Sequence, residues 1–121
     1  MVNVLIADDD RETAETLAEL LALYLDPLQV VLAFDGAQAL EAALAGNHAF
    51  DAILTDIEMP KMDGINVAIR VRSKLGPATP VLIALTGHVG IAKLQAITDA
   101  FDHVLVKPVK IDELVRLLRG L

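Results

Sequence analysis

The chain has 121 residues, which is enough for one domain with a hydrophobic core of its own. Its net charge of −7 and its lack of tryptophan argue against a nucleic-acid-binding surface, which needs clustered cations and aromatic stacking. Although 55% of the residues are apolar, no apolar run approaches the ~18 residues of a membrane span, so no membrane contact is expected. The first residues carry no secretory signal, and the absence of cysteine excludes disulfides and favours a cytoplasmic location.

Apolar segments of strand length alternate along the chain with amphipathic segments of helix length. In chain order we expect a strand at Val2–Ala7, a helix at Arg11–Leu25, a strand at Gln29–Ala33, a helix from Gly36 to Ala45, a strand at Ala52–Thr55, a helix from about Ile65 to Leu75, a strand at Val81–Leu85, a helix over roughly Ile91–Asp99, a strand at Val104–Val106 and a helix at Ile111–Arg119. Such alternation implies right-handed crossovers and a parallel sheet. The sequence therefore predicts one α/β domain over residues 1–121, a doubly wound five-stranded parallel sheet with helices on both faces.

Charged residues follow three of the predicted strands. Asp8, Asp9 and Asp10 come after the first strand, Asp56 after the third and Lys107 after the fifth. The carboxyl ends of parallel strands share one edge of the sheet, where ligands bind. Asp10 is expected to cap the helix that follows it. The other four side chains are then expected to gather in one site.

A cluster of this kind needs a cation or bound protons. Two carboxylates ~4 Å apart repel by roughly 4 kcal/mol at an effective dielectric constant of 20. Oxygen ligands in an open site favour Mg²⁺, with Mn²⁺ as a substitute. Carboxylates, a divalent ion and one lysine together suit the binding of a phosphoryl group.

Short motifs stand at the predicted strand ends in a definite order. They are Asp8-Asp9, Asp56, Met59-Pro60, Asp63-Gly64, Thr86 and Lys107-Pro108. In this order they resemble the receiver domains of two-component response regulators and hybrid histidine kinases, and the resemblance covers essentially the whole chain. It implies a flavodoxin-like fold with the strand order 2-1-3-4-5.

The resemblance implies a phosphoacceptor in a phosphorelay rather than a turnover enzyme. Asp56 would accept a phosphoryl group in line from a phosphohistidine on a histidine kinase or a histidine phosphotransfer domain, with the help of Mg²⁺. Asp9 and Asp56 would bind the metal ion directly, and Asp8 would bind it through water. Glu58 would contribute its backbone carbonyl.

The remaining site residues would recognise the phosphoryl group. Lys107 would pair with Asp56 at rest and with the phosphoryl oxygens afterwards, and Thr86 would donate its hydroxyl to one of those oxygens. A cis peptide bond is implied before Pro108. The signal would leave through the surface of the fourth helix, fifth strand and fifth helix, and a homodimer through the same face is left open.

Some positions vary or depart from the usual pattern of the family. Gly87 stands where alanine is common, and Val104 replaces an aromatic residue whose rotation normally reports phosphorylation. Glu58 and His88 lie where receivers control the approach of water, although a solvated loop position is the commoner case for a histidine such as His88. We therefore expect phosphorylation to act on the Gly87-His88 loop without a switch at residue 104.

Two alternatives stay open at this point. An aspartyl-phosphate hydrolase on a related scaffold would use Asp8-x-Asp10 after the first strand, but Arg11 and Glu12 follow and Thr13 comes one place late. A degenerate receiver could serve as a docking module only, which the intact acidic set argues against.

The termini and the remaining histidines carry less information. Since Met1 leads directly into the first strand and the sequence stops at the last helix, we expect no output domain within it, as in a stand-alone receiver or one from a hybrid kinase. His48 and His103 have no spaced partner and are expected to be partly exposed residues that flank strands.

Overall fold

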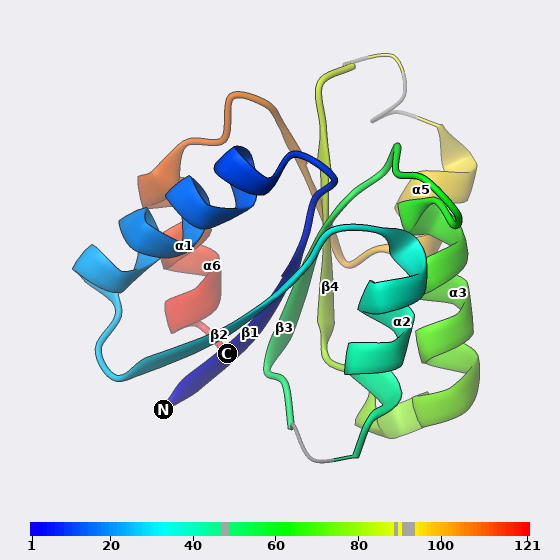
Figure 1. The fold of residues 1–121 in the computed structure, drawn as a ribbon, viewed down its shortest axis with the longest axis horizontal. Helices are drawn as coiled ribbons and strands as arrows, with labels where there is room; N and C mark the ends of the chain where they lie inside the picture. Colours follow the sequence, from blue (N-terminus) through cyan, green and yellow to red (C-terminus); the bar gives the residue numbers. More distant parts are fainter. Residues whose placement is uncertain (47–48, 89, 91–93) are drawn as a thin grey trace.

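Strands and helices alternate along the chain in the computed structural model, which describes residues 1–46, 49–88, 90 and 94–121 (Figure 1). The strands are β1 Val2–Ala7, β2 Leu28–Ala33, β3 Ala52–Asp56, β4 Val81–Thr86 and β5 His103–Val106. The helices are α1 Arg11–Tyr24, α2 Gly36–Leu44, α3 Gly64–Leu75, α5 Gln95–Ala100 and α6 Ile111–Arg119, with a short 3₁₀ turn at Gly76–Ala78. The predicted order of elements is confirmed for the described residues.

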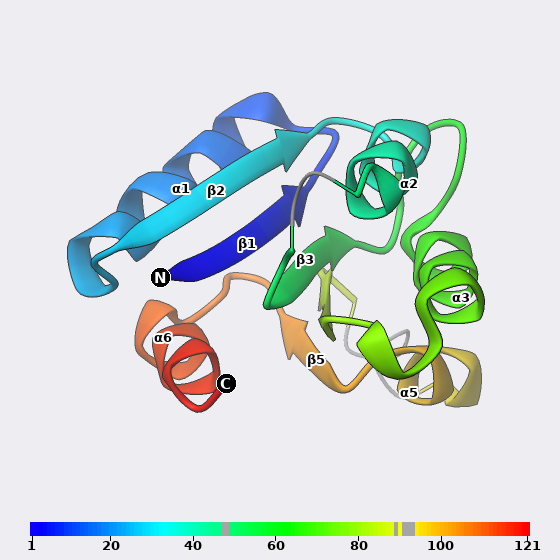
Figure 2. The same cartoon turned by 90° about the horizontal axis from the view of Figure 1, so that it is seen from below.

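The strands form one parallel sheet in the order β2-β1-β3-β4-β5. Helices α1 and α6 cover one face of this sheet, and α2, α3 and α5 cover the other (Figure 2). Both the doubly wound architecture and the strand order expected from the family resemblance are confirmed. None of the helices in the described part of the chain combines the length and apolar character that crossing a bilayer requires.

Two hydrophobic clusters, one on each face, hold the layers together. Val4 and Ile6 of β1 join the cluster under α1 and α6, whereas Leu5 and Ala7 join the cluster under α2, α3 and α5. This division follows from the alternation of side chains along a strand. Because both faces of β1 are covered, the segment is apolar throughout its inner part, as a strand in a parallel sheet should be.

Aspartates cap three helices at the edge where the strands end. Asp10 accepts the N–H groups of residues 12 and 13 at the start of α1, as predicted. Asp35 accepts the N–H of Gln38 in α2, and Asp63 accepts the N–H of Asn66 in α3. Each cap satisfies an N–H group that has no partner within its helix. The caps fix the loops that surround this edge of the sheet.

The predicted bounds differ from the structure at several ends. Strands β3 and β4 each run one residue further than predicted, because Asp56 and Thr86 still pair in the ladder, with Leu85 and Val106 respectively. The predicted helix over Ile91–Asp99 lies partly outside the described residues, and its described part is α5. In α6, Leu114 and Leu118 are buried and Leu117 is half-buried, so these leucines form the inner face of the helix.

Candidate functional site

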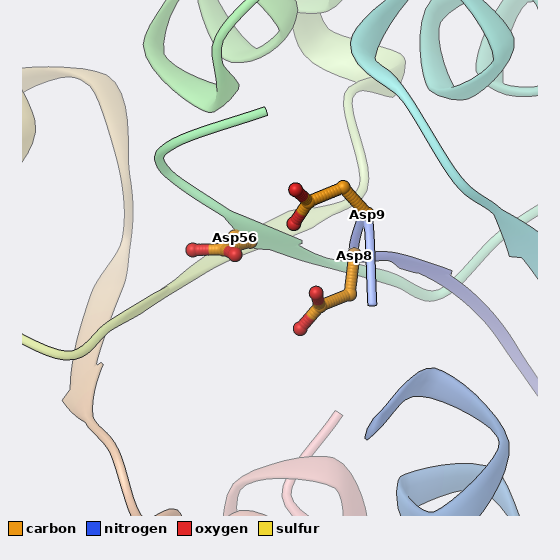
Figure 3. Close-up of side chains that lie close together, drawn as sticks. All are labelled: Asp8, Asp9 and Asp56. Carbon is orange, nitrogen blue, oxygen red and sulfur yellow. The ribbon is translucent and has the colours of Figure 1, made fainter. Parts of the chain in front are cut away.

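The three predicted acidic residues come together at the carboxyl edge of the sheet. Asp8 directly follows β1 and Asp56 ends β3, and these strands are neighbours, so the two side chains emerge side by side (Figure 3). Each of Asp8, Asp9 and Asp56 offers a carboxylate oxygen, and these oxygens lie within 4.8 Å of one another. Asp8 is buried, Asp56 is half-buried and Asp9 is exposed. The arrangement offers an oxygen-only ligand set that is open to solvent on one side.

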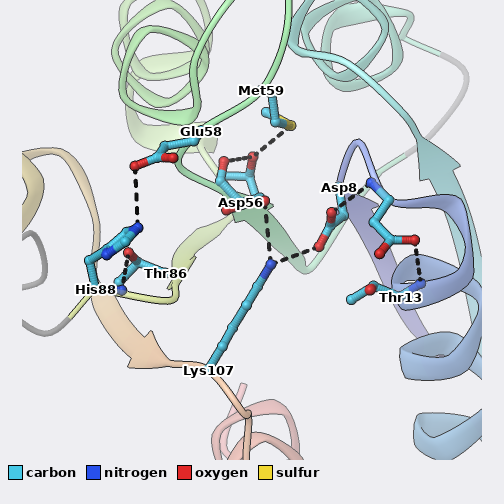
Figure 4. Close-up of polar contacts among 10 residues, drawn as sticks. Asp8, Thr13, Asp56, Glu58, Met59, Thr86, His88 and Lys107 are labelled. Atoms are coloured by element: carbon cyan, nitrogen blue, oxygen red, sulfur yellow. Dashed lines mark hydrogen bonds and ion pairs between the residues drawn. The ribbon is translucent and has the colours of Figure 1, made fainter.

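Lys107 reaches this cluster from the end of β5. Its Nζ atom donates to Oδ2 of Asp8 at 3.0 Å and lies 3.3 Å from Oδ2 of Asp56 (Figure 4). Its backbone N–H donates to the carbonyl of Thr86 at 2.7 Å, which fixes the start of the loop beside β4. The peptide bond before Pro108 is cis, as the family resemblance implied.

Asp8 is the most constrained of the three acids. Its side chain is 2% exposed, and while Oδ2 binds Lys107, Oδ1 accepts the N–H of Asp10 at 2.9 Å. Both oxygens therefore already have a donor. Asp8 consequently acts as a fixed anion at the bottom of the site.

The ionisation of Asp56 and Lys107 reflects their surroundings. Burial raises the pKa of Asp56 above its usual value of 3.8, and the charge of Asp8 adds to this effect while Lys107 opposes it. Burial alone would lower the pKa of Lys107, but its hydrogen bond to Asp8 and the charges of Asp56 and Asp8 raise it overall. The lysine is therefore a permanent cation, and the carboxylate of Asp56 gains from any further positive charge nearby.

Thr86 is buried at the end of β4, in the strand between those that carry Asp56 and Lys107. Its Oγ1 accepts the backbone N–H of His88 at 3.2 Å (Figure 4). A hydroxyl has acceptor and donor capacity, and this bond uses only the former. The structure thus brings Thr86 to the predicted edge, and its hydroxyl proton has no acceptor among the residues that the structure describes.

Glu58 and His88 form a contact between two loops that border the site. Oε1 of Glu58 lies 3.8 Å from Nε2 of His88, and both side chains are about two-thirds exposed, at 68% and 65% (Figure 4). An exposed pair at this distance contributes little to stability. Both side chains are exposed beside the site, and their influence on the approach of water stays a prediction.

Val104 is half-buried and packs against the cluster under α2, α3 and α5. Its partner in the ladder is Ala84, so little side-chain volume surrounds it on β4. Of the histidines given little weight, His103 is exposed and His48 lies outside the described residues.

The sequence interpretation missed two features of the site. One is Asp35, which is buried and pairs with Lys61 across two loops, with Nζ 3.4 Å from Oδ2. The Asp35-Gly36 dipeptide after a strand is the only feature of the sequence that points to this position, and it does not reveal Lys61 as the partner of Asp35. The preference of Lys107 for Asp8 was missed in the same way.

Comparisons with known proteins agree with this geometry. The family model described as "Response regulator receiver domain" matches residues 4–119. The chain is 36% identical over 121 residues to "Response regulator MprA" of Mycobacterium sp. (strain KMS), covering 99% of this chain and 50% of that protein. It thus spans about half the length of the curated relatives it matches.

Solved structures show the same fold. The response regulator protein TrrA from Thermotoga maritima, in complex with Mg²⁺-BeF, has a TM-score of 0.86 at 29% identity, covering 99% of this chain and 98% of that one. The chemotaxis response regulator CheY4 of Vibrio cholerae has a TM-score of 0.81 at 28% identity, with the same coverage. The chain therefore belongs to the receiver-domain family of two-component response regulators, and its Asp8, Asp9 and Asp56 fit the phosphoacceptor site of that family.

Proposed function

We propose that Asp56 is the phosphoacceptor and that it receives its phosphoryl group from a phosphohistidine on a histidine kinase or a histidine phosphotransfer domain. The observation that carries this proposal is the contrast between Asp56 and Asp8. Asp8 is 2% exposed and has a donor on each oxygen, whereas the side chain of Asp56 is 14% exposed and only its Oδ2 lies near Lys107 among the described residues. This contrast argues against the hydrolase alternative, in which the first aspartate after β1 would attack.

The residues present fit a magnesium ion. The ligand set consists of carboxylate oxygens, which Mg²⁺ prefers, and Mn²⁺ could replace it. The raised pKa of Asp56 supports the same assignment, because a nearby cation would favour its charged form. Asp9 and Asp56 would hold the ion directly, Asp8 through water and Glu58 through its backbone carbonyl. When bound, the ion would neutralise charge on the phosphoryl oxygens.

The chain's own residues then carry the transfer. A carboxylate oxygen of Asp56 attacks phosphorus in line; the new O–P bond forms as the N–P bond to the donor histidine breaks, and the ring nitrogen keeps the electron pair. Lys107 shifts its contact from Asp56 to a phosphoryl oxygen while Asp8 continues to hold its ammonium group. Thr86 donates its hydroxyl proton to a second phosphoryl oxygen.

The product is a signal and not a released compound, so we propose a phosphoacceptor that is not a turnover enzyme. The output surface would consist of α5, β5 and α6, where Leu94 and Val106 expose apolar side chains. We propose that the domain forms a homodimer through this face. We propose no contact of this domain with nucleic acid or with a membrane. The absence of cysteine supports a cytoplasmic location.

The test is labelling with acetyl phosphate in the presence of Mg²⁺, followed by intact-mass measurement. Wild-type protein should gain one phosphoryl group, and Asp56→Asn should gain none. Asp9→Asn serves as a comparison that keeps the nucleophile but removes a metal ligand, so it should label slowly. Full labelling of Asp56→Asn that is lost in Asp8→Asn would overturn the proposal in favour of the hydrolase.

A further inference from the structure

The loop between β3 and α3, residues 57–63, rests directly on the start of α2. The N–H of Gly36 donates to the carbonyl of Pro60 at 3.4 Å. A Cβ atom on Gly36 would collide with the carbonyl oxygen of Met62, so this approach of two backbones requires glycine. The loop is also closed at its base, where the N–H of Gly64 donates to the carbonyl of Ile57 at 2.7 Å. It therefore forms a compact unit that contacts α2 at its tip.

A charged pair spans the same contact. Lys61 at the tip of the loop lies with Nζ 3.4 Å from Oδ2 of Asp35, and the side chain of Asp35 is only 10% exposed. The other oxygen, Oδ1, accepts the N–H of Gln38 at 2.7 Å. Asp35 is thus fixed by the helix that it caps, and it presents a buried anion to the loop.

Lysine is an unusual residue for the backbone conformation found at position 61. Its φ angle is +69°, in the left-handed region that glycine or asparagine adopts with less strain than lysine. Its side chain is 68% exposed, so burial of the carbon stem does not account for a lysine here. What lysine supplies at this position is an ammonium group within reach of Asp35.

We propose that Asp35 and Lys61 are positioning residues for the metal site. The pair would hold the tip of the loop on α2 and thereby fix the backbone carbonyl of Glu58, three residues before Lys61, in the direction of Asp8, Asp9 and Asp56. The inference rests on the proposed function, because it takes Glu58 as a ligand of the metal ion. The N–H of Met62 donates to the carbonyl of Pro60 at 2.8 Å, which closes the turn that carries Lys61.

The experiment is a titration of metal-free protein with Mg²⁺, in which the NMR chemical shifts of the backbone amides report binding. Loss of partners outside the ligand shell commonly weakens metal binding 10- to 100-fold, and for this exposed lysine we expect Lys61→Met to raise the Kd about threefold to tenfold. Lys61→Arg should restore affinity to within about twofold, since arginine keeps the charge. Lys74→Met, at the opposite end of α3, is the matched control and should bind as the wild type does.

Two further variants separate positioning from stability. Lys61→Asn suits the left-handed backbone and replaces the long cationic side chain by a short neutral one, so it should be at least as stable as the wild type and still bind Mg²⁺ more weakly. Asp35→Asn keeps an oxygen for the α2 cap and removes the charge. If the two residues act as a pair, the double variant Asp35→Asn, Lys61→Met should bind no more weakly than either single variant.

The outcomes distinguish this inference from the proposed function. If wild-type protein shows no Mg²⁺-dependent shifts, the proposed function fails. If the wild type binds Mg²⁺ and Lys61→Met and Lys61→Asn bind it equally well, only the positioning role is overturned. The positioning role would also be overturned if Lys61→Arg bound Mg²⁺ as weakly as Lys61→Met does, since the charge would then be irrelevant.

Discussion

The ammonium group of Lys107 lies closer to Asp8, at 3.0 Å, than to Asp56, at 3.3 Å. The family resemblance implied Asp56 as its partner at rest, and the structure divides the lysine between two acids. Because Asp8 is buried and stays in place, Asp56 can exchange its lysine contact for a phosphoryl group without leaving Lys107 unpaired. The buried carboxylate of Asp8 thus holds the ammonium group of Lys107 in place while the phosphoryl group is transferred to Asp56.

Removal of this cation should destabilise the metal-free protein. We expect Lys107→Met to lower the free energy of unfolding by about 1–3 kcal/mol at neutral pH, less than for a fully buried pair because the lysine is partly exposed. Urea denaturation in a chelating buffer measures the change. Lys110→Met, an exposed lysine at the start of α6, is the control and should change stability by less than about 0.5 kcal/mol. Equal effects of the two substitutions would show that Asp8 does not depend on Lys107.

The raised pKa of Asp56 predicts a specific dependence of stability on pH. A carboxyl whose pKa is higher in the folded state stabilises the fold when it is protonated, and this contribution is lost as the pH rises through the folded-state pKa. In metal-free protein at neutral pH, Asp56→Asn should therefore be more stable than the wild type. The difference should shrink as the pH falls toward and below 3.8, where Asp56 is protonated in both states. Thermal unfolding across this range tests it, and a difference that grows on acidification would contradict the burial effect.

Two glycines near the site should respond to alanine in opposite ways. A Cβ atom on Gly87 meets nothing within 4 Å, and its φ angle is not in the left-handed region. Gly87→Ala should therefore raise the free energy of unfolding by about 0.4–1 kcal/mol, because alanine lowers the conformational entropy of the unfolded chain. A Cβ atom on Gly64 would collide with the carbonyl oxygen of Asp56, so Gly64→Ala should lower stability by about 1–3 kcal/mol. Denaturant melts of the two variants give the comparison, and a loss of stability in Gly87→Ala would show that the loop needs glycine.

Val104 should not act as a rotamer switch. Valine is short, and its branched Cβ restricts it to few rotamers. Phosphorylation should therefore shift amide signals at Thr86, Gly87 and His88 and leave the Val104 methyl signals nearly unchanged. Val104→Tyr should phosphorylate with acetyl phosphate at close to the wild-type rate, because the substitution lies outside the metal and phosphoryl contacts. Large methyl shifts together with a static loop would refute this expectation.

The sequence by itself determined the architecture and the approximate place of the site. Hydrophobic periodicity and turn residues are local signals, so they set the order of strands and helices and left Asp8, Asp9, Asp56 and Lys107 at strand ends. Since parallel strands end at one edge, the order of the elements was enough to place these four residues together. The strand order itself came from the resemblance to receiver domains.

Only the tertiary structure decided how the loops above that edge meet. The choice of Asp8 as the closer partner of Lys107 depends on the relative depth of two strand ends, and the Asp35–Lys61 pair depends on a backbone approach that Gly36 permits. Such contacts join residues far apart in the chain and leave no periodic pattern. They arise from the register of neighbouring strands and the path of each crossover, which are settled when the sheet and its helices pack.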